Sequence, residues 1–250
     1  MIIPWNYFCH YGDTTLLEEH YCGMKHWVEY LNTRTDDKGI VVREEPNGWC
    51  LGEWSTPHNV IEIPAPLVNT AYFYHVTCIM ANIANILNKK DDENELRILA
   101  RTIKRNFNIA FYNEVTHHYW EGKQGADVFA LAFGLVPESD RKKVFAALLE
   151  HLEKINYHFD TGILATPLLL KVLTENGRAD LAYRVMNQRD FPSYGYLADK
   201  KNNTLWETWN GDGNDEGCGH CHPMFGSVVA WFYNSLAGIK PVSYTHLRAH

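Results

Sequence analysis

The chain has 250 residues, a net charge of −7 and a sequence pI near 6.0, with 46% hydrophobic and 13% aromatic residues. These values suit one globular domain or a piece of a larger one. Because no basic run occurs, they argue against a nucleic-acid or anionic-membrane partner. The sequence has no uninterrupted stretch of about 18 apolar residues, and its six cysteines form no disulfide framework, so neither a membrane-spanning helix nor a small secreted scaffold is expected.

Helical periodicity dominates the chain. Residues 14–34 repeat apolar side chains at three- and four-residue steps, as in Met24 and Val28. Residues 66–89 are apolar on nearly every side, which predicts a buried helix with Pro66 in its first turn. Further helices are predicted over residues 91–113, 125–136, 138–156, 166–177, 178–188 and 224–239. No segment alternates convincingly as a strand does, so the sequence predicts an all-α fold with about eight helices.

Two long loops interrupt these helices, over residues 43–66 and 189–223. Loops of this length in a compact domain are usually functional or disordered. Disordered segments are poor in aromatic residues. These loops, however, hold four of the eight tryptophans, which are Trp49, Trp54, Trp206 and Trp209. The aromatic content fits a large core, or a cleft in which flat rings stack on a sugar.

The second loop contains TLWETWNGDGNDEG, in which Glu207 lies between Trp206 and Trp209. A carboxylate beside apolar rings is partly desolvated, which makes it a stronger base. Glycoside hydrolysis uses carboxylates in pairs, one as the acid and the other as base or nucleophile. The alternative is a solvated loop carboxylate. The DGNDEG portion is not expected to bind calcium, because Pro223 occupies the position where an EF-hand loop needs glutamate.

The same loop continues into CGHCH, residues 218–222, which has the C-x-x-C-H spacing of c-type haem attachment and two cysteines that could bind zinc. No second cysteine pair or spaced histidine pair accompanies it, and no βαβ unit surrounds it as a redox dithiol would require. We therefore expect no metal and no cofactor, and we interpret His222 as the working residue of this stretch. A haem or metal protein remains the alternative that a colourless, metal-free preparation would remove.

The segment TLWETWNG is followed closely by HCHPMFGSVVAWFYNSLAGI. Four segments precede these two in the chain, in the order YGDTTLLEEHYCGMKHWVEYL, LGEWSTPHNVIEIPAPLVNTAYFY, QGADVFALAFGLVP and QRDFPSYGYL. In this order the segments resemble the α-L-rhamnosidase family, whose catalytic domain is a six-hairpin (α/α)6 barrel. The resemblance covers residues 1–241 and implies one partial barrel domain, with about eight of the twelve helices. Residues 242–250 continue no helical pattern and are expected to be a non-native tail.

The resemblance implies an inverting hydrolase that removes terminal α-L-rhamnose from glycosides or polysaccharides, so a rhamnose-containing carbohydrate is the expected partner. Glu207 matches the family's general base, which activates a water molecule. His222 matches a histidine that reaches the sugar, and Trp54 matches a tryptophan that lines the rhamnose pocket. The pocket wall, or the layer behind that wall, is expected to include Trp206 and Trp209.

Two positions depart from the family pattern. Glu53, which we also assign to the sugar pocket, replaces a common aspartate, and Cys221 replaces a common asparagine. The family's general acid lies in an upstream acidic, Arg-containing segment that matches nothing here, so we expect the chain by itself to be weakly active or inactive. The alternatives are another six-hairpin glycosidase, which would cleave a glucoside, and a non-catalytic remnant, which would bind sugar without turnover.

Overall fold

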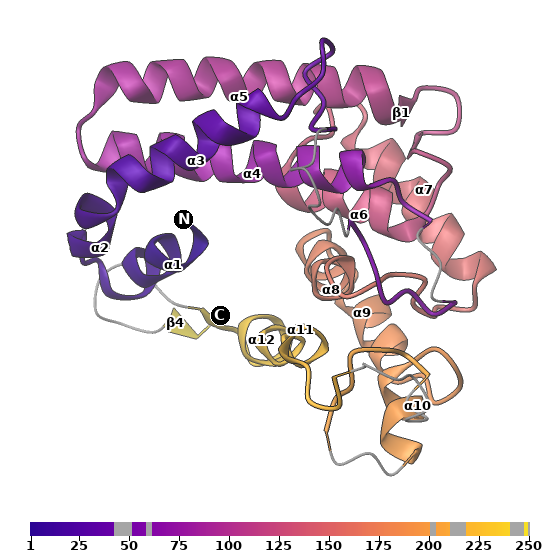
Figure 1. Cartoon of the computed structure of the whole chain (residues 1–250). Coiled ribbons are helices and arrows are strands. Elements are labelled where there is room, and N and C mark those ends of the chain that lie inside the picture. Colours follow the sequence, from indigo (N-terminus) through magenta and orange to yellow (C-terminus); the bar gives the residue numbers. More distant parts are fainter. Residues whose placement is uncertain (43–51, 59–61, 201–203, 211–218, 241–247, 250) are drawn as a thin grey trace. The chain divides into compact units, whose positions relative to one another are not determined.

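The computed structural model describes residues 1–42, 52–58, 62–200, 204–210, 219–240 and 248–249 (Figure 1). The chain divides into two compact units, and each is described by itself. Unit 1 comprises Met1–Cys50, Pro66–Phe111 and Gly238–His250, and unit 2 comprises Leu51–Ala65 and Tyr112–Ala237.

The described part of unit 1 contains two helices of 22 residues each and three shorter ones. They are α1 (Ile2–Tyr11), α2 (Thr15–Glu19), α3 (Tyr21–Thr33), α4 (Ala65–Ile86) and α5 (Lys90–Phe111). A short ladder pairs β3 (Ile239–Lys240) antiparallel with β4 (Arg248–Ala249). Helix α1 was not predicted, because it has no fully buried residue and therefore no marked apolar face.

The helix predicted over residues 14–34 is interrupted at His20, where the backbone leaves the helical region (φ −102°, ψ 7°). The break turns Tyr21 into the core, where its hydroxyl donates to Asp92 Oδ2 at 2.7 Å. Tertiary packing therefore overrides the local helical pattern at this position.

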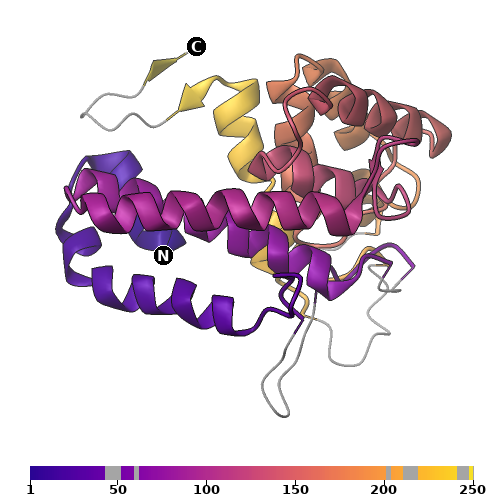
Figure 2. The ribbon, with the colours of Figure 1, turned by 90° about the horizontal axis from the view of Figure 1, so that it is seen from above.

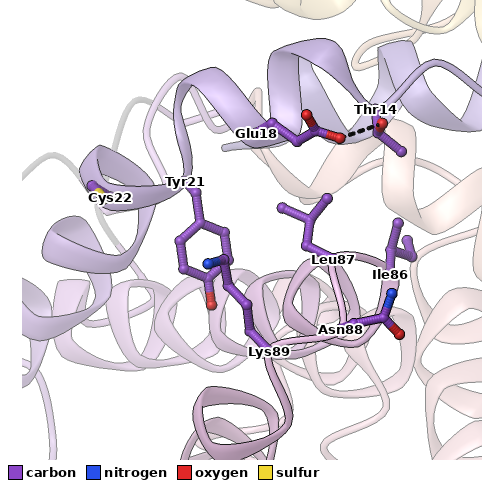
Figure 3. A pocket seen from close by; sticks show the side chains of 8 residues that line it. All are labelled: Thr14, Glu18, Tyr21, Cys22, Ile86, Leu87, Asn88 and Lys89. Carbon is purple, nitrogen blue, oxygen red and sulfur yellow. Dashed lines mark hydrogen bonds between the residues drawn. The ribbon is translucent and has the colours of Figure 1, made fainter.

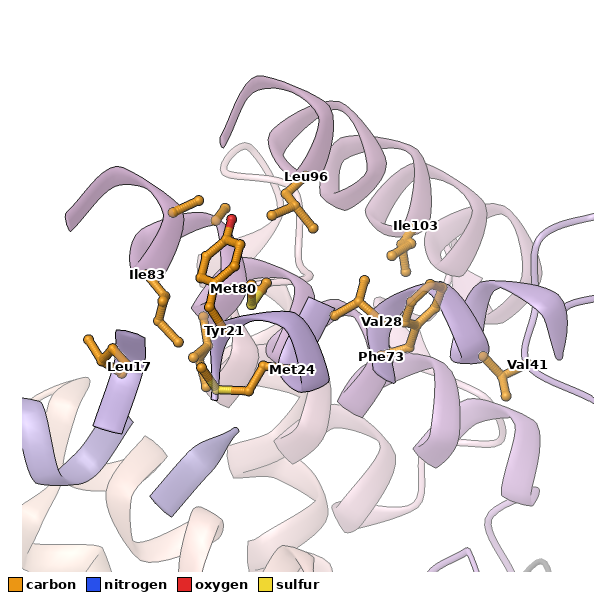
Figure 4. Packing of buried hydrophobic residues seen from close by; sticks show 13 residues of the cluster. Leu17, Tyr21, Met24, Val28, Val41, Phe73, Met80, Ile83, Leu96 and Ile103 are labelled. Atoms are coloured by element: carbon orange, nitrogen blue, oxygen red, sulfur yellow. The ribbon is translucent and has the colours of Figure 1, made fainter. Parts of the chain in front are cut away.

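The core of unit 1 lies between α3, α4 and α5. Figure 4 shows apolar side chains from the three helices facing one another. The cluster includes Met24 and Val28 of α3, Phe73, Met80 and Ile83 of α4, and Leu96 and Ile103 of α5. Helix α4 has buried residues all along its length, as its apolar sequence predicted.

Unit 2 is a succession of shorter helices that pair with their neighbours, best followed in Figure 2. The elements are β1 (Tyr112–Asn113), β2 (His118–Tyr119), α6 (Gln124–Phe133), α7 (Arg141–Lys154), α8 (Ala165–Glu175), α9 (Ala179–Met186), α10 (Tyr194–Asp199), α11 (Pro223–Gly226), α12 (Val229–Trp231) and a π-helical turn, η1 (Phe232–Leu236). Helix α6 packs on α7 and α8, and α8 packs on α9. The all-α prediction is confirmed, since the strands described are two pairs of two residues each.

Helix α10 lies inside a segment predicted to be a loop. It has six residues, too few for helical periodicity to be read from the sequence. Its start is fixed by Ser193, whose hydroxyl oxygen accepts the Tyr196 N–H at 3.0 Å.

Within the described residues, no helix is long and apolar enough to cross a membrane. The described cysteines, at positions 9, 22, 78 and 221, are free thiols. The predicted domain end at residue 241 and the tail over residues 242–250 stay predictions, because most of the tail lies outside the described residues.

Candidate active site

The predicted site residues all belong to unit 2, and both of its long loops bind to one turn. This anchor turn, residues 161–165, leads into α8. The Trp54 carbonyl accepts the Ile163 N–H at 3.1 Å, and the Trp209 indole N–H donates to the Thr161 carbonyl at 3.0 Å. The anchor turn therefore brings together two segments that are more than 140 residues apart in the chain.

The segments that carry Glu207 and His222 are hydrogen-bonded to each other. The Glu207 N–H donates to the Gly219 carbonyl, and the His222 N–H donates to the Leu205 carbonyl, both at 2.9 Å. In return, the Gly219 N–H donates to Glu207 Oε2 at 2.9 Å. This reciprocal pairing brings the proposed base and the proposed sugar-binding histidine into one short ladder, and it orients the carboxylate.

Trp206 and His220 form a flat aromatic stack beside this ladder. Their rings lie 4.0 Å apart between centroids and within 12° of parallel. Trp206 is half-buried, whereas His220 is exposed. The sequence predicts a role for Trp206 but none for His220, because ring stacking between the two depends on the ladder pairing.

Trp209 lies in the interior of unit 2, with 1% of its surface exposed. Its ring stacks on Phe159 at 5.0 Å between centroids and meets Tyr194 edge-on at 5.4 Å. Phe225 approaches it from a third direction at 4.5 Å. Trp209 is therefore a core residue of unit 2, and its predicted place in or behind the wall of a sugar pocket stays a prediction.

Glu53 is completely buried, with 0% of its surface exposed. Its Oε1 accepts the N–H of Ala165, the first residue of α8, at 3.0 Å. Burial raises the pKa of the Glu53 carboxyl to about 8, although backbone N–H groups of the anchor turn oppose that shift. A side chain sealed in this way does not lie against a sugar-accessible surface in the described structure.

A second buried carboxylate, Asp127 of α6, fastens the β1–β2 hairpin to the helices. Its Oδ2 pairs with His118 Nδ1 at 2.6 Å, and its Oδ1 accepts the Tyr119 N–H at 2.7 Å. Burial raises the pKa of Asp127, and the hydrogen bond to Asp127 raises the pKa of His118. The pair is a structural clasp that cannot be recognised from the sequence, because the two residues carry no motif.

Unit 1 contains a separate hollow of about 430 Å³. Figure 3 shows its lining, which consists of Thr14, Glu18, Tyr21, Cys22, Ile86, Leu87, Asn88 and Lys89. The Lys89 ammonium lies over the Tyr21 ring, 4.7 Å from its centroid. No predicted site residue lines this hollow. Among the residues that the structure describes, no group of three or more His, Cys, Asp or Glu could hold a metal ion, but Cys218 lies outside them.

Comparison with known proteins places these features in a family. The model of the bacterial alpha-L-rhamnosidase 6 hairpin glycosidase domain matches residues 1–236. An α-L-rhamnosidase of Streptomyces avermitilis is 34% identical over 250 residues, which is 96% of this chain and 23% of that protein. One from Formosa agariphila is 30% identical over 247 residues, covering 96% of this chain and 27% of its own length. The chain thus spans about a quarter of these curated relatives.

Solved structures give the same result. The Streptomyces avermitilis α-L-rhamnosidase complexed with L-rhamnose superposes with a TM-score of 0.84 at 32% identity, over 96% of this chain and 23% of that one. The α-L-rhamnosidase from Dictyoglumus thermophilum superposes with a TM-score of 0.87 at 37% identity, over 95% of this chain and 27% of that one.

Proposed function

Because this chain belongs to the bacterial α-L-rhamnosidase six-hairpin glycosidase family, we propose that it forms part of an enzyme that hydrolyses terminal α-L-rhamnose from glycosides or polysaccharides. The observation that carries the proposal is the ladder in which Glu207 and His222 are hydrogen-bonded neighbours beside the Trp206 ring. The relative from Streptomyces avermitilis, solved with L-rhamnose, supports the choice of sugar.

In the proposed mechanism Glu207 is the general base. Its Oε2 is held by the Gly219 N–H, which leaves Oε1 as the oxygen that takes a proton from water. The water then attacks the anomeric carbon from the face opposite the leaving group, and the glycosidic oxygen departs with a proton from a general acid. An inverting pair of carboxyl groups stands roughly 6.5–9.5 Å apart, so that water fits between them. We assign the base to this chain and do not assign the acid to any of its residues.

His222 and Trp54 are proposed to bind the sugar. The imidazole of His222 offers one donor or acceptor to a ring hydroxyl, and its backbone is fixed by Leu205. Trp54 is half-buried and its backbone is fixed to the anchor turn, so its indole is the aromatic face that the described part of the first loop offers. An aromatic face suits the apolar C6 methyl group of rhamnose.

The test uses p-nitrophenyl α-L-rhamnoside, because p-nitrophenolate leaves with little help from an acid and the base can be assayed alone. Glu207→Gln should lower kcat by about 10²–10⁴-fold, the usual contribution of general base catalysis. The matched control is Glu121→Gln, which removes an exposed carboxylate of the same unit and should leave the rate unchanged.

Three further readouts test the mechanism and distinguish the alternatives. With the unmodified chain, an inverting enzyme should release the β anomer of L-rhamnose first, which proton NMR identifies before mutarotation. Cleavage of the matching glucoside at a similar rate would instead indicate another six-hairpin glycosidase. Saturable L-rhamnose binding without any turnover of the activated rhamnoside by the unmodified chain would instead favour a sugar-binding role for this chain.

A further inference from the structure

The buried carboxyl group of Glu53 is fitted to the start of α8. Besides the Ala165 N–H at 3.0 Å, the N–H groups of Gly162 and Leu164 act on the carboxyl as hydrogen-bond donors that lower its pKa. A Cβ atom at position 162 would meet the Trp54 carbonyl oxygen at 2.0 Å and Glu53 Oε1 at 2.9 Å. Only glycine therefore allows the Glu53–Trp54 backbone to approach the anchor turn this closely.

The backbone on both sides of Glu53 and Trp54 is bent into the left-handed region. Gly52 has φ 58° and Ser55 has φ 57°. The second value is uncommon for a residue with a side chain, and such a conformation persists only where the surroundings hold it. The contacts available to hold it are the Glu53 carboxyl on Ala165 and the Trp54 carbonyl on Ile163.

Two buried oxygens next to these contacts have no hydrogen-bond partner among the described residues. They are Glu53 Oε2 and Asp160 Oδ1. Ionised carboxylates only accept hydrogen bonds, so two charged groups cannot satisfy each other. Burial is the main cause that raises the pKa of Glu53, and the charge of Asp160 adds a smaller effect in the same direction. The other oxygen of Asp160, Oδ2, pairs with His151 Nε2 of α7. A proton on Glu53 Oε2 would turn that buried atom from an acceptor without a partner into a donor.

We propose that Glu53 is a positioning residue: its carboxyl group fastens the Trp54 segment to the first turn of α8 and does not itself contact the sugar. The group does this in the neutral form, with Oε1 accepting from the Ala165 N–H. Ionisation at alkaline pH places a second negative charge beside Asp160 in a buried site and releases the segment. The consequence for rhamnose binding rests on the function proposed for Trp54, whereas the fastening itself does not.

The test measures amide hydrogen exchange, as protection factors corrected for pH, at pH 6 and pH 9.5. The reporters are the Ile163 and Ala165 amides, and the Tyr119 amide, bonded to Asp127, is the internal reference. In the unmodified protein, protection of both reporters should fall at least tenfold between the two pH values while the reference stays within twofold.

Glu53→Gln is the decisive variant, because an amide keeps the Oε1 acceptor and supplies a donor that cannot ionise. Protection of both reporters should then change less than twofold between pH 6 and pH 9.5. Glu62→Gln is the matched control from the same segment, since Glu62 is only half-buried and pairs with Lys123 at 3.0 Å. The Glu62→Gln variant should keep the tenfold fall in protection that the unmodified protein shows.

A tenfold fall in the protection of Ile163 and Ala165 in the Glu53→Gln variant, equal to that of the unmodified protein, would overturn the proposal. If Glu53→Gln does not fold, the unmodified protein decides, because pH-independent protection of Ile163 and Ala165 in that protein would also overturn the proposal.

L-Rhamnose affinity is measured in parallel, and Glu53→Gln should retain that affinity at pH 9.5. A tenfold weaker affinity at pH 6 with intact protection would show direct sugar contact by Glu53 and refute the positioning role. If no variant and no unmodified protein binds rhamnose, the proposed function fails, and the exchange data alone decide the fastening.

Discussion

Trp209 gives the sharpest test of how the site is supported. The change Trp209→Phe keeps a ring against Phe159 but removes the indole N–H that donates to the Thr161 carbonyl. A buried carbonyl left without its donor costs about 1–3 kcal/mol, and the smaller ring leaves a void worth about 1 kcal/mol more. We therefore expect a loss of about 2–4 kcal/mol in the free energy of unfolding, and about 5 kcal/mol for Trp209→Ala.

Urea denaturation followed by circular dichroism at 222 nm measures this loss. Trp27→Phe is the matched control, because Trp27 is 49% exposed and its replacement should cost less than about 0.5 kcal/mol. A Trp209→Phe protein as stable as the control, but with a raised KM for the rhamnoside, would contradict this prediction. It would show that Trp209 contacts the sugar and does not act as a buried support of the anchor turn.

Three further outcomes are expected. The carboxyl of Glu53 has a folded-state pKa of about 8 against an ordinary value of 4.5, so its contribution to stability is complete below pH 4.5 and is lost as the pH rises through 8. The free energies of unfolding measured with denaturant at pH 5 and pH 9 should differ by about 3–5 kcal/mol because of this group. Glu53→Gln should remove that difference, and equal free energies of unfolding at the two pH values in the unmodified protein would contradict the prediction. His118→Ala should lower the free energy of unfolding by about 3–5 kcal/mol at pH 6, because it leaves the Asp127 carboxylate buried without its partner. A melting temperature equal to that of the unmodified protein would contradict the role of this pair as a clasp. His220→Ala should expose the face of Trp206 and increase acrylamide quenching of tryptophan fluorescence, whereas unchanged quenching would show that the stack does not persist in solution.

Much of the fold could be predicted from the sequence, because the signals are local. The helices α4 to α9 follow from apolar periodicity over ten or more residues in most cases, and the resemblance to a six-hairpin glycosidase domain follows from motifs in a fixed order. The exceptions are short or lack a marked apolar face. Helix α10 has six residues, α1 has no buried face, and the break at His20 depends on a contact with Asp92 of α5.

The helical architecture, the family and the residues of the candidate site follow from the sequence, because periodicity and motif order depend only on neighbours along the chain. The tertiary structure alone decided which of these residues are exposed. Trp206 and Trp209 are three positions apart in one motif, yet the first stacks on His220 while the second is buried beneath the anchor turn. Glu53 and Trp54 are adjacent, yet the carboxyl is sealed against α8. The reason is that burial is set by segments that meet the site from far along the chain, and residues 161–165, which hold both loops, carry no signal of that role except a glycine before a helix.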